Sequence, residues 1–228
     1  MEYLHNGFTL ELCDGAFPLS TDSIALSDFA RLPRQAQVLD LGAGCGTLGM
    51  LLCASDPSCT VTGIEINEDA HHMALGNAAA NGLTHRLTSI CADLRTVSSC
   101  LKPGSFHCCV SNPPYFTAKQ ASANSTARHE QLCSLNDLFA AATWSVRYGG
   151  DFFLVHKPER LAELCACATA HKLEPKRLLL LRHRPDKPIS LVLLQCRKGA
   201  KPGLTIEEEV LQTADGEPSA YYRRLYHI

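Results

Sequence analysis

Apolar and polar positions follow two alternating patterns along most of the chain. Short apolar runs of strand length are separated by stretches in which apolar residues recur at helical spacing. These runs predict buried strands at 37–41, 60–66, 87–91, 106–111 and 152–156. The intervening stretches predict one helix that starts at 47 and two that span 68–81 and 158–172. A further helix is predicted from a cap at Ser134 or Asn136 to 148, where Gly149 and Gly150 break it.

Two further strands, 177–181 and 189–196, follow with only a proline-rich turn between them. Strand–helix alternation is typical of a doubly wound, mostly parallel α/β sheet, whereas strands joined by a turn pair antiparallel. We therefore expect a seven-stranded, Rossmann-like α/β sheet with an antiparallel edge strand. The expected domain is single and spans 1–228, with 1–30 as an N-terminal decoration that contributes to the cofactor site and 204–228 as a C-terminal extension.

Composition limits the protein class. The chain has 228 residues, of which 46% are hydrophobic, enough for one buried core. No run approaches the roughly 20 apolar residues of a membrane span, and residues 1–12 lack the pattern of a signal peptide, so we expect a cytosolic protein without a membrane partner. The twelve cysteines include no C-x-x-C pair, and we expect them to be mostly reduced and buried, without a metal site.

Charge is distributed unevenly behind a net value of -2. Residues 146–203 are strongly basic, whereas the segments before and after them are acidic. A basic block of this kind suits a polyanion-binding face, and it equally suits a solvated surface of scattered charges.

A glycine-rich loop follows the first predicted buried strand. The strand ends in Asp40, and Gly42, Gly44 and Gly46 then lead into a helix at Thr47. Alternate glycines let a ligand lie against bare backbone. Residues 44–49 also fit the dinucleotide pattern G-x-G-x-x-G, and a loop without any ligand stays open as an alternative.

Two acidic residues follow the next two strands. Glu65 ends the second strand, where a carboxylate can accept hydrogen bonds from both ribose hydroxyls of a nucleoside. Asp93, followed by Leu94, ends the third and can accept from an adenine amino group, or it can be an ordinary helix cap. These residues indicate a nucleoside cofactor without identifying which one.

The segment Ser111-Asn112-Pro113-Pro114-Tyr115-Phe116 directly follows the fourth strand. It resembles the signature of class I methyltransferases that alkylate exocyclic amino or amide nitrogens. The Asn112 side-chain oxygen and the Pro113 carbonyl can each accept one N–H of a planar target, while two prolines stiffen the turn. Tyr115 can stack on the flat target group.

This resemblance implies S-adenosylmethionine as cofactor and a set of site residues. The catalytic turn is Asn112, Pro113, Pro114 and Tyr115, and the cofactor-binding residues are Thr21, Asp22, Asp40, Gly42, Gly44, Gly46, Glu65, Asp93, Leu94 and Asn112. In the resembled group a Thr-Asp pair before the first strand packs near the methionine end of the cofactor, although Ser20-Thr21-Asp22 is equally a helix cap.

Four segments are together similar to the bacterial tRNA1(Val) adenine-37 N6-methyltransferase family. They are 17–22, 112–116, 127–130 and the tail that runs from 185–188 to 197–199. The resemblance implies transfer to the N6 of an adenine in RNA, most simply tRNA near the anticodon, with Tyr115, Phe116 and Arg128 contacting the substrate. The slightly acidic net charge and the unmatched residues 204–228 depart from that pattern.

Three other functions remain open from sequence. A protein glutamine amide suits the Asn-Pro-Pro-Tyr turn equally well, although such enzymes usually carry a helical domain ahead of the core, for which 36 residues leave no room. A cofactor-binding protein without catalysis is the second alternative, and an NAD oxidoreductase is the third. Titration of both cofactors discriminates the last of these.

Overall fold

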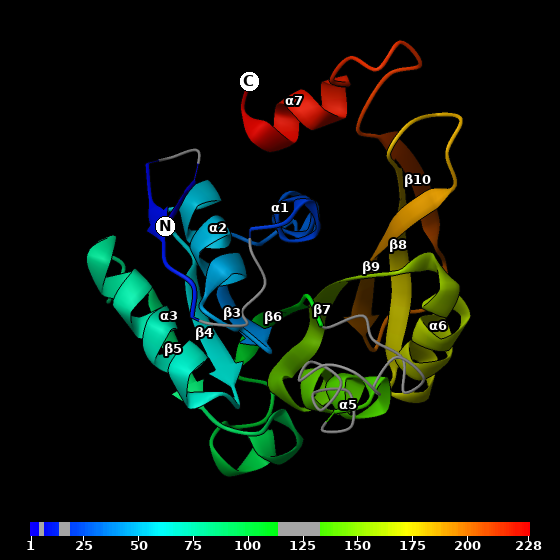
Figure 1. Ribbon diagram of the computed structural model, residues 1–228. Coiled ribbons are helices and arrows are strands. Elements are labelled where there is room, and N and C mark those ends of the chain that lie inside the picture. Colours follow the sequence, from blue (N-terminus) through cyan, green and yellow to red (C-terminus); the bar gives the residue numbers. More distant parts are fainter. Residues whose placement is uncertain (5–6, 14–18, 114–132) are drawn as a thin grey trace, which may run out of the picture.

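The computed structural model describes residues 1–4, 7–13, 19–113 and 133–228 (Figure 1). Its main sheet has the strand order β10-β8-β9-β7-β6-β3-β4-β5. These strands are β3 (Gln37–Leu41), β4 (Thr60–Glu65), β5 (Leu87–Cys91), β6 (Phe106–Ser111), β7 (Val146–His156), β8 (Leu173–Arg182), β9 (Ile189–Lys198) and β10 (Thr205–Val210). All neighbours pair in parallel except β9, which is antiparallel to β7 and β8.

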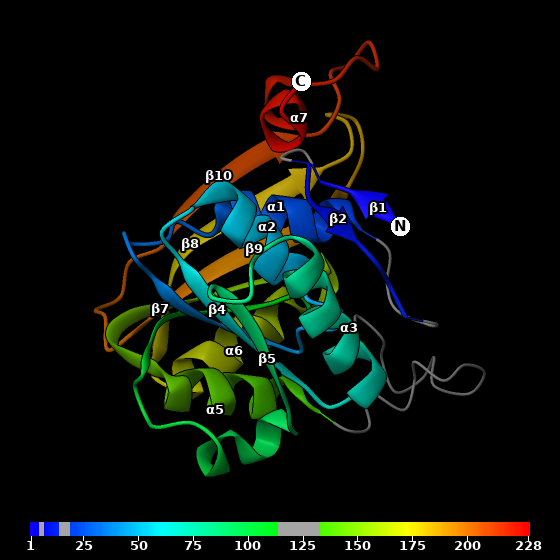
Figure 2. The same ribbon diagram turned by 90° about the vertical axis from the view of Figure 1, so that its left-hand side faces the viewer.

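Helices cover both faces of this sheet because most strand residues are apolar on both sides, as parallel strands require. The helices are α1 (Thr21–Phe29), α2 (Thr47–Ser55), α3 (Glu68–Ala80), α5 (Leu135–Ser145), α6 (Leu161–Ala170) and α7 (Ala220–Tyr226), with short 3-10 turns η1 (Leu94–Ser99) and η2 (Pro158–Arg160). Figure 2 shows α1 and α2 on the side of the sheet opposite to α5. Phe153 packs with α1 and α2 in one buried cluster, and its neighbour Phe152 packs with α5 in the other.

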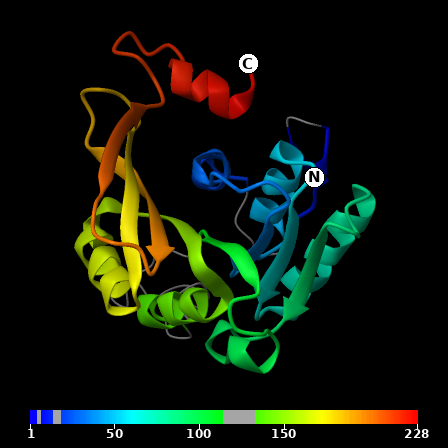
Figure 3. The ribbon, with the colours of Figure 1, turned by 180° about the vertical axis from the view of Figure 1, so that it is seen from behind.

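The predicted α/β fold is confirmed, with two corrections at one end of the sheet. The described residues form an eight-stranded sheet, because β10 pairs in parallel with β8 and takes the edge position. The antiparallel strand is β9, and it lies inside the sheet between β8 and β7. Figure 3 shows β8 and β10 at one end of the sheet and β4 and β5 at the other.

The helix predicted to reach residue 148 ends earlier. α5 begins after Ser134, whose side chain forms a reciprocal capping box with Asp137, but it ends at Ser145. Gly149 and Gly150 lie inside β7, where the pairing with β6 shifts register and leaves an irregular bulge. A Cβ atom on Gly150 would lie 2.5 Å from the His107 carbonyl oxygen, so the two glycines permit a bulge and do not end a helix.

The first residues add a small hairpin of β1 (Glu2–Tyr3) and β2 (Thr9–Leu10), which pair antiparallel. The C-terminal helix α7 packs against α1, which itself contacts α2 and β7. None of the helices in the described part of the chain has the length and apolar character that a bilayer crossing requires.

Candidate active site

Register brings the ends of four strands to one edge of the sheet. Glu65 pairs with Cys91, Ile64 pairs with Leu41, and the pairing of Asp40 with Val110 sets Leu41 beside Ser111. The glycine loop therefore starts between Glu65 and Asn112, with neighbouring strands about 4.8 Å apart. Residues that are distant in sequence thus meet at the carboxyl edge, where open α/β sheets bind ligands.

The glycine loop exposes its backbone at two of its three glycines. Gly42, Gly44 and Gly46 have φ values of 77°, 55° and 84°, in the left-handed region. A Cβ atom built on Gly42 or Gly44 would meet no described residue within 4 Å, whereas one on Gly46 would lie 3.2 Å from the Ala74 Cβ. Gly46 thus serves the packing of α2 on α3, and the open space at Gly44 leaves room for a ligand.

Glu65 is buried and holds the loop by its carboxylate. Its Oε2 accepts the Gly44 N–H at 2.8 Å, and its Oε1 accepts the Asn67 N–H at 2.8 Å. A carboxylate has about four acceptor positions, so both oxygens can still accept ligand hydroxyls. This arrangement is compatible with the predicted ribose contact.

Asp40 lies at the end of β3 with 1% of its surface exposed. Its Oδ2 has no hydrogen-bond partner among the described residues. Burial, reinforced by the negative charge of Glu65 and opposed by the Gly49 N–H, raises the pKa of Asp40 to about 7. A buried carboxylate with an unpartnered oxygen suits a cationic or N–H-donating ligand.

Asp93 follows β5 and is engaged by its own neighbour. It is the N-cap of η1, and its carboxylate accepts the Arg95 N–H and forms an ion pair with the Arg95 guanidinium. This hydrogen-bonded pair lowers the pKa of Asp93. The cap interpretation is confirmed, and contact with an adenine amino group stays a prediction; Leu94 packs against the core beside it.

Asn112 is oriented by a residue of α1. Its Nδ2 donates to the Ser23 Oγ at 2.9 Å, and Ser23 is buried. Because the nitrogen of the amide is directed at Ser23, its oxygen is directed elsewhere. One residue earlier, the Ser111 Oγ donates to the Leu41 carbonyl at 2.7 Å, which ties the catalytic turn to the start of the glycine loop.

The predicted Thr21-Asp22 pair forms the first turn of α1. Ser20 caps this helix, because its Oγ accepts the Ser23 N–H at 3.4 Å, and Asp22 lies in the acidic first turn. Thr21 Oγ1 hydrogen-bonds the Tyr226 hydroxyl of α7 at 2.9 Å. The cap is confirmed, and α1 lies beside the site through Ser23.

Several predicted site residues fall outside the part of the chain that the structure describes. These are Pro114, Tyr115, Phe116 and Arg128, together with the segment 17–18; Pro113 directly follows Asn112 and is described. Within the described ranges, no group of three or more His, Cys, Asp or Glu residues could hold a metal ion.

Three residues that shape the site carried no sequence signal of their own. Ser23 and Ser111 are buried serines that directly adjoin the predicted Thr21-Asp22 pair and the Asn-Pro-Pro-Tyr turn. Asn77, in the middle of α3, donates to the Cys45 carbonyl at 2.9 Å and exchanges two hydrogen bonds with the Glu11 backbone at 2.8 Å. A buried asparagine on an otherwise alanine-rich helical face was the one available hint.

Comparison with known proteins shows which proteins this chain resembles. Residues 22–164 match the family described as "Methyltransferase small domain". The chain is 30% identical to the tRNA1(Val) (adenine(37)-N6)-methyltransferase of Aeromonas hydrophila, over 92% of this chain and 89% of that protein. It is 28% identical to the enzyme of the same name from Porphyromonas gingivalis, over 83% of this chain and 78% of that protein.

A solved structure shares the fold. A predicted O-methyltransferase from Agrobacterium tumefaciens superposes with a TM-score of 0.77 at 21% identity, and the match covers 91% of this chain and 96% of that one. At that identity the likeness concerns the arrangement of helices and strands.

Proposed function

The chain belongs to the methyltransferase small-domain family, and we propose that it transfers a methyl group from S-adenosylmethionine to the exocyclic N6 of an adenine in RNA, in a tRNA near the anticodon. The observation that carries this proposal is the orientation of the Asn112 amide by Ser23, at the sheet edge that also holds the glycine loop. The names of the matched relatives support the same substrate. The same proposal implies a cytosolic protein, because its RNA substrate is there.

The cofactor side of the site fits an adenosyl group. When bound, S-adenosylmethionine supplies an electrophilic methyl on a positively charged sulfur. The open backbone at Gly44 leaves room for the ligand, the Glu65 oxygens accept ribose hydroxyls, and the Asp40 carboxylate favours positive charge nearby.

The target side of the site needs alignment more than acid–base help. An adenine amino nitrogen is a poor nucleophile because its lone pair is delocalised into the ring. The Asn112 oxygen accepts one of its N–H groups and the Pro113 carbonyl accepts the other, which turns the lone pair toward the methyl group as the nitrogen becomes tetrahedral. Tyr115, outside the described residues, is proposed to stack on the base, and Phe116 and Arg128 to contact the RNA.

The ribose role of Glu65 is tested by substitution. Glu65→Ala removes both acceptors and also the hydrogen bond to Gly44, so S-adenosylmethionine binding should weaken by about 1.5–3 kcal/mol, the scale of hydrogen bonds to a charged group. Calorimetric titration measures this directly. Unchanged affinity would remove Glu65 from the cofactor site.

The substrate class is tested with labelled S-adenosylmethionine. The protein is incubated with total RNA and, separately, with total protein, and the RNA is then digested to nucleosides. We expect label in N6-methyladenosine released from tRNA. Label on protein glutamine would replace this proposal by protein methylation, and cofactor binding without any transfer would leave a catalytically silent binding protein.

A further inference from the structure

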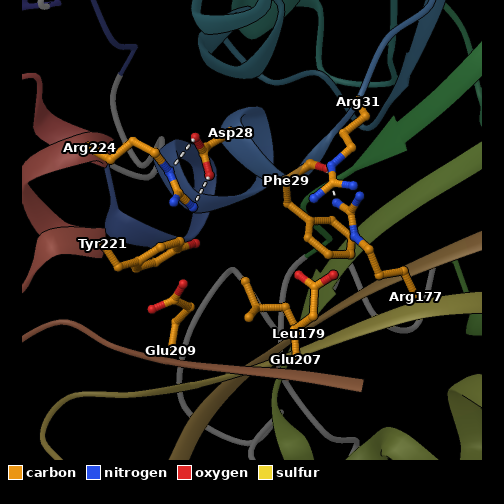
Figure 4. Close-up of a pocket in the computed structure, with 9 residues that line it drawn as sticks. All are labelled: Asp28, Phe29, Arg31, Arg177, Leu179, Glu207, Glu209, Tyr221 and Arg224. Carbon is orange, nitrogen blue, oxygen red and sulfur yellow. Dashed lines mark hydrogen bonds and ion pairs between the residues drawn. The ribbon is translucent and has the colours of Figure 1, made fainter. Parts of the chain in front are cut away.

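A second cleft lies on the α1 and α7 side of the sheet. Two adjoining cavities of about 230 Å³ and 380 Å³ share the lining residues Arg31, Arg177 and Glu207. Figure 4 shows the first of these cavities with the residues that line it. Arg177 lies in the middle of β8 and pairs with Thr205 at the start of β10, whereas the edge that holds Asn112 carries the carboxyl ends of the parallel strands. The cleft is therefore separate from the site built around Asn112.

Arg177 is a buried cation without a carboxylate partner among the described residues. It is 7% exposed, its guanidinium stacks on the Phe29 ring at 3.9 Å, and its Nη2 donates to the Phe29 carbonyl. Its Nε has no hydrogen-bond partner, and the guanidinium forms no ion pair with any carboxylate in the described ranges. A buried charge of this kind is unfavourable unless an opposite charge comes near it.

A second arginine lies beside it. Figure 4 shows the Arg31 guanidinium next to that of Arg177, and Arg31 also makes no ion pair in the part of the chain that the structure describes. Burial and the positive charge of Arg31 lower the pKa of the Arg177 guanidinium. Two adjacent cations repel each other, so this arrangement favours a bound anion.

The acidic residues nearby do not fill that role. Asp28 pairs with Arg224 at 3.2 Å, and Asp151 accepts hydrogen bonds from Arg197 at 2.9 Å and Gln195 at 3.0 Å. Glu207 lines both cavities and attracts Arg177, yet it makes no ion pair within 4 Å among the described residues. Free N–H donors therefore remain on the cationic side of the cleft.

We propose that Arg31 and Arg177, with Lys176 at the rim, bind a phosphate group. The planar fork of a guanidinium matches the oxygens of a phosphate, and two such groups side by side provide both charge and direction. Lys176 lines the second cavity, and its Nζ donates to the Lys201 carbonyl at 3.1 Å, which leaves further N–H groups of the ammonium for an anion. The phosphate comes either from an RNA backbone or from a free phosphorylated molecule.

The first arm of the test uses inorganic phosphate. Isothermal titration at constant ionic strength compares the wild-type protein with Arg31→Met and with Arg34→Met, a matched control three residues away that does not line either cavity. We expect wild type and Arg34→Met to bind alike and Arg31→Met to bind about tenfold more weakly or worse, the scale of one lost charge-assisted contact. Arg31 is exposed, so its replacement leaves the core intact.

The second arm uses bulk tRNA, with affinity measured across salt concentrations for the same three proteins. A lower salt dependence for Arg31→Met, by about one unit of the logarithmic slope, assigns the phosphate to the RNA backbone. Weakened binding of inorganic phosphate with unchanged tRNA binding assigns it to a free phosphorylated molecule. If Arg31→Met matches wild type in both arms, or if Arg34→Met shows the same losses, the proposal is overturned.

Discussion

At the residue scale, Asp40 combines deep burial with an oxygen that has no partner in the described residues. Its pKa of about 7 lies above that of a free carboxyl, so the folded protein retains a proton that the unfolded chain releases. The free protein should therefore lose stability as pH rises from about 4 to about 7. A cationic ligand beside Asp40 favours the ionised carboxylate, so Asp40 is deprotonated in the complex at a pH where it is protonated in the free protein.

Cofactor binding should consequently depend on pH. The Kd for S-adenosylmethionine should fall about tenfold per pH unit between about 5 and 7 and level off above 7, because binding must first release the Asp40 proton. Titration calorimetry at several pH values measures this. Asp40→Asn should bind S-adenosylmethionine more weakly, and its Kd should no longer depend on pH in this way. Ionisation of S-adenosylmethionine itself affects both proteins alike, so the difference between them reports on Asp40. The same pH dependence in both would show that Asp40 does not sense the cofactor.

Substitutions of Asn112 and Ser23 distinguish the residue that accepts the target N–H from the residue that orients it. Asn112→Ala removes the proposed acceptor and should lower the single-turnover rate about 100-fold, the scale of a lost transition-state hydrogen bond. Ser23→Ala leaves the acceptor in place but frees its orientation, so a smaller loss, about tenfold, is expected. Cofactor affinity should change little in either.

Ser27→Ala is the matched control for Ser23→Ala. Ser27 lies on the same helix, and its Oγ donates to the Ile24 carbonyl at 2.8 Å, away from Asn112. Its rate should equal that of wild type. A Ser23→Ala protein with wild-type rate would leave the Ser23 contact without a positioning role.

The site residues that sequence could predict are those with local patterns. Asp40 and Glu65 each lie near the end of a strand, the glycines directly follow the first of these strands, and the Asn-Pro-Pro turn is contiguous. Ser23 and Asn112 are 89 positions apart, and Asn77 and Glu11 are 66 apart. Contacts of that separation depend on how the layers pack, so sequence periodicity does not predict them.

At the element scale, two glycines of different geometry provide a matched pair. Gly44 has a φ of 55°, whereas Gly76 lies in the exposed middle of α3 with nothing within 4 Å of its Cβ position. Gly44→Ala should destabilise the protein by about 1 kcal/mol or more and weaken cofactor binding. Gly76→Ala should stabilise it by about 0.5–1 kcal/mol. Urea unfolding measures both changes.

Binding measurements on the same two variants complete that comparison. Gly76→Ala should bind S-adenosylmethionine like wild type, because α3 presents Gly76 to solvent. A Gly44→Ala protein with wild-type stability and affinity would show that the loop does not require glycine at position 44 and that the ligand does not lie there.

The end of α5 and the whole of β10 escaped prediction for physical reasons. α5 ends at Ser145, where the Lys198 ammonium of β9 donates to the Thr143 and Val146 carbonyls at 2.6 and 2.9 Å, a contact from 52 or more residues away. β10 contains three consecutive glutamates, which mask the alternation of a strand. Charged residues on an edge strand discourage pairing with other chains.

At the scale of the whole molecule, the C-terminal extension supports the helix that carries Ser23. Thr21 and Asp28, at the two ends of α1, contact Tyr226 and Arg224 of α7. The tail, which matched no motif, thus braces an element beside the catalytic turn. Sequence gave the tail no role, because its contacts span about 200 positions.

The basic block of 146–203 contributes a cluster of partly exposed cations near the edge of the sheet that holds Asn112. Arg182, Arg184 and Lys187 lie at the end of β8 and in the turn that follows, and their acidic neighbours Glu208 and Asp186 are 3.4–3.7 Å away. Exposed pairs at such distances are weak, so these cations remain available to RNA phosphates.

Replacing Arg182, Arg184 and Lys187 together by Gln should therefore reduce the salt dependence of tRNA binding by about two to three units of the logarithmic slope, because each contact releases about one counterion. Filter binding at several salt concentrations measures the slope. The matched control replaces Arg34, Lys102 and Arg147, three exposed cations near the amino ends of β3, β6 and β7, at the opposite edge of the sheet.

Because both triple variants lose the same charge, a general field effect would lower both slopes equally. A loss confined to the first variant would place the RNA beside Asn112, and equal losses would contradict that placement.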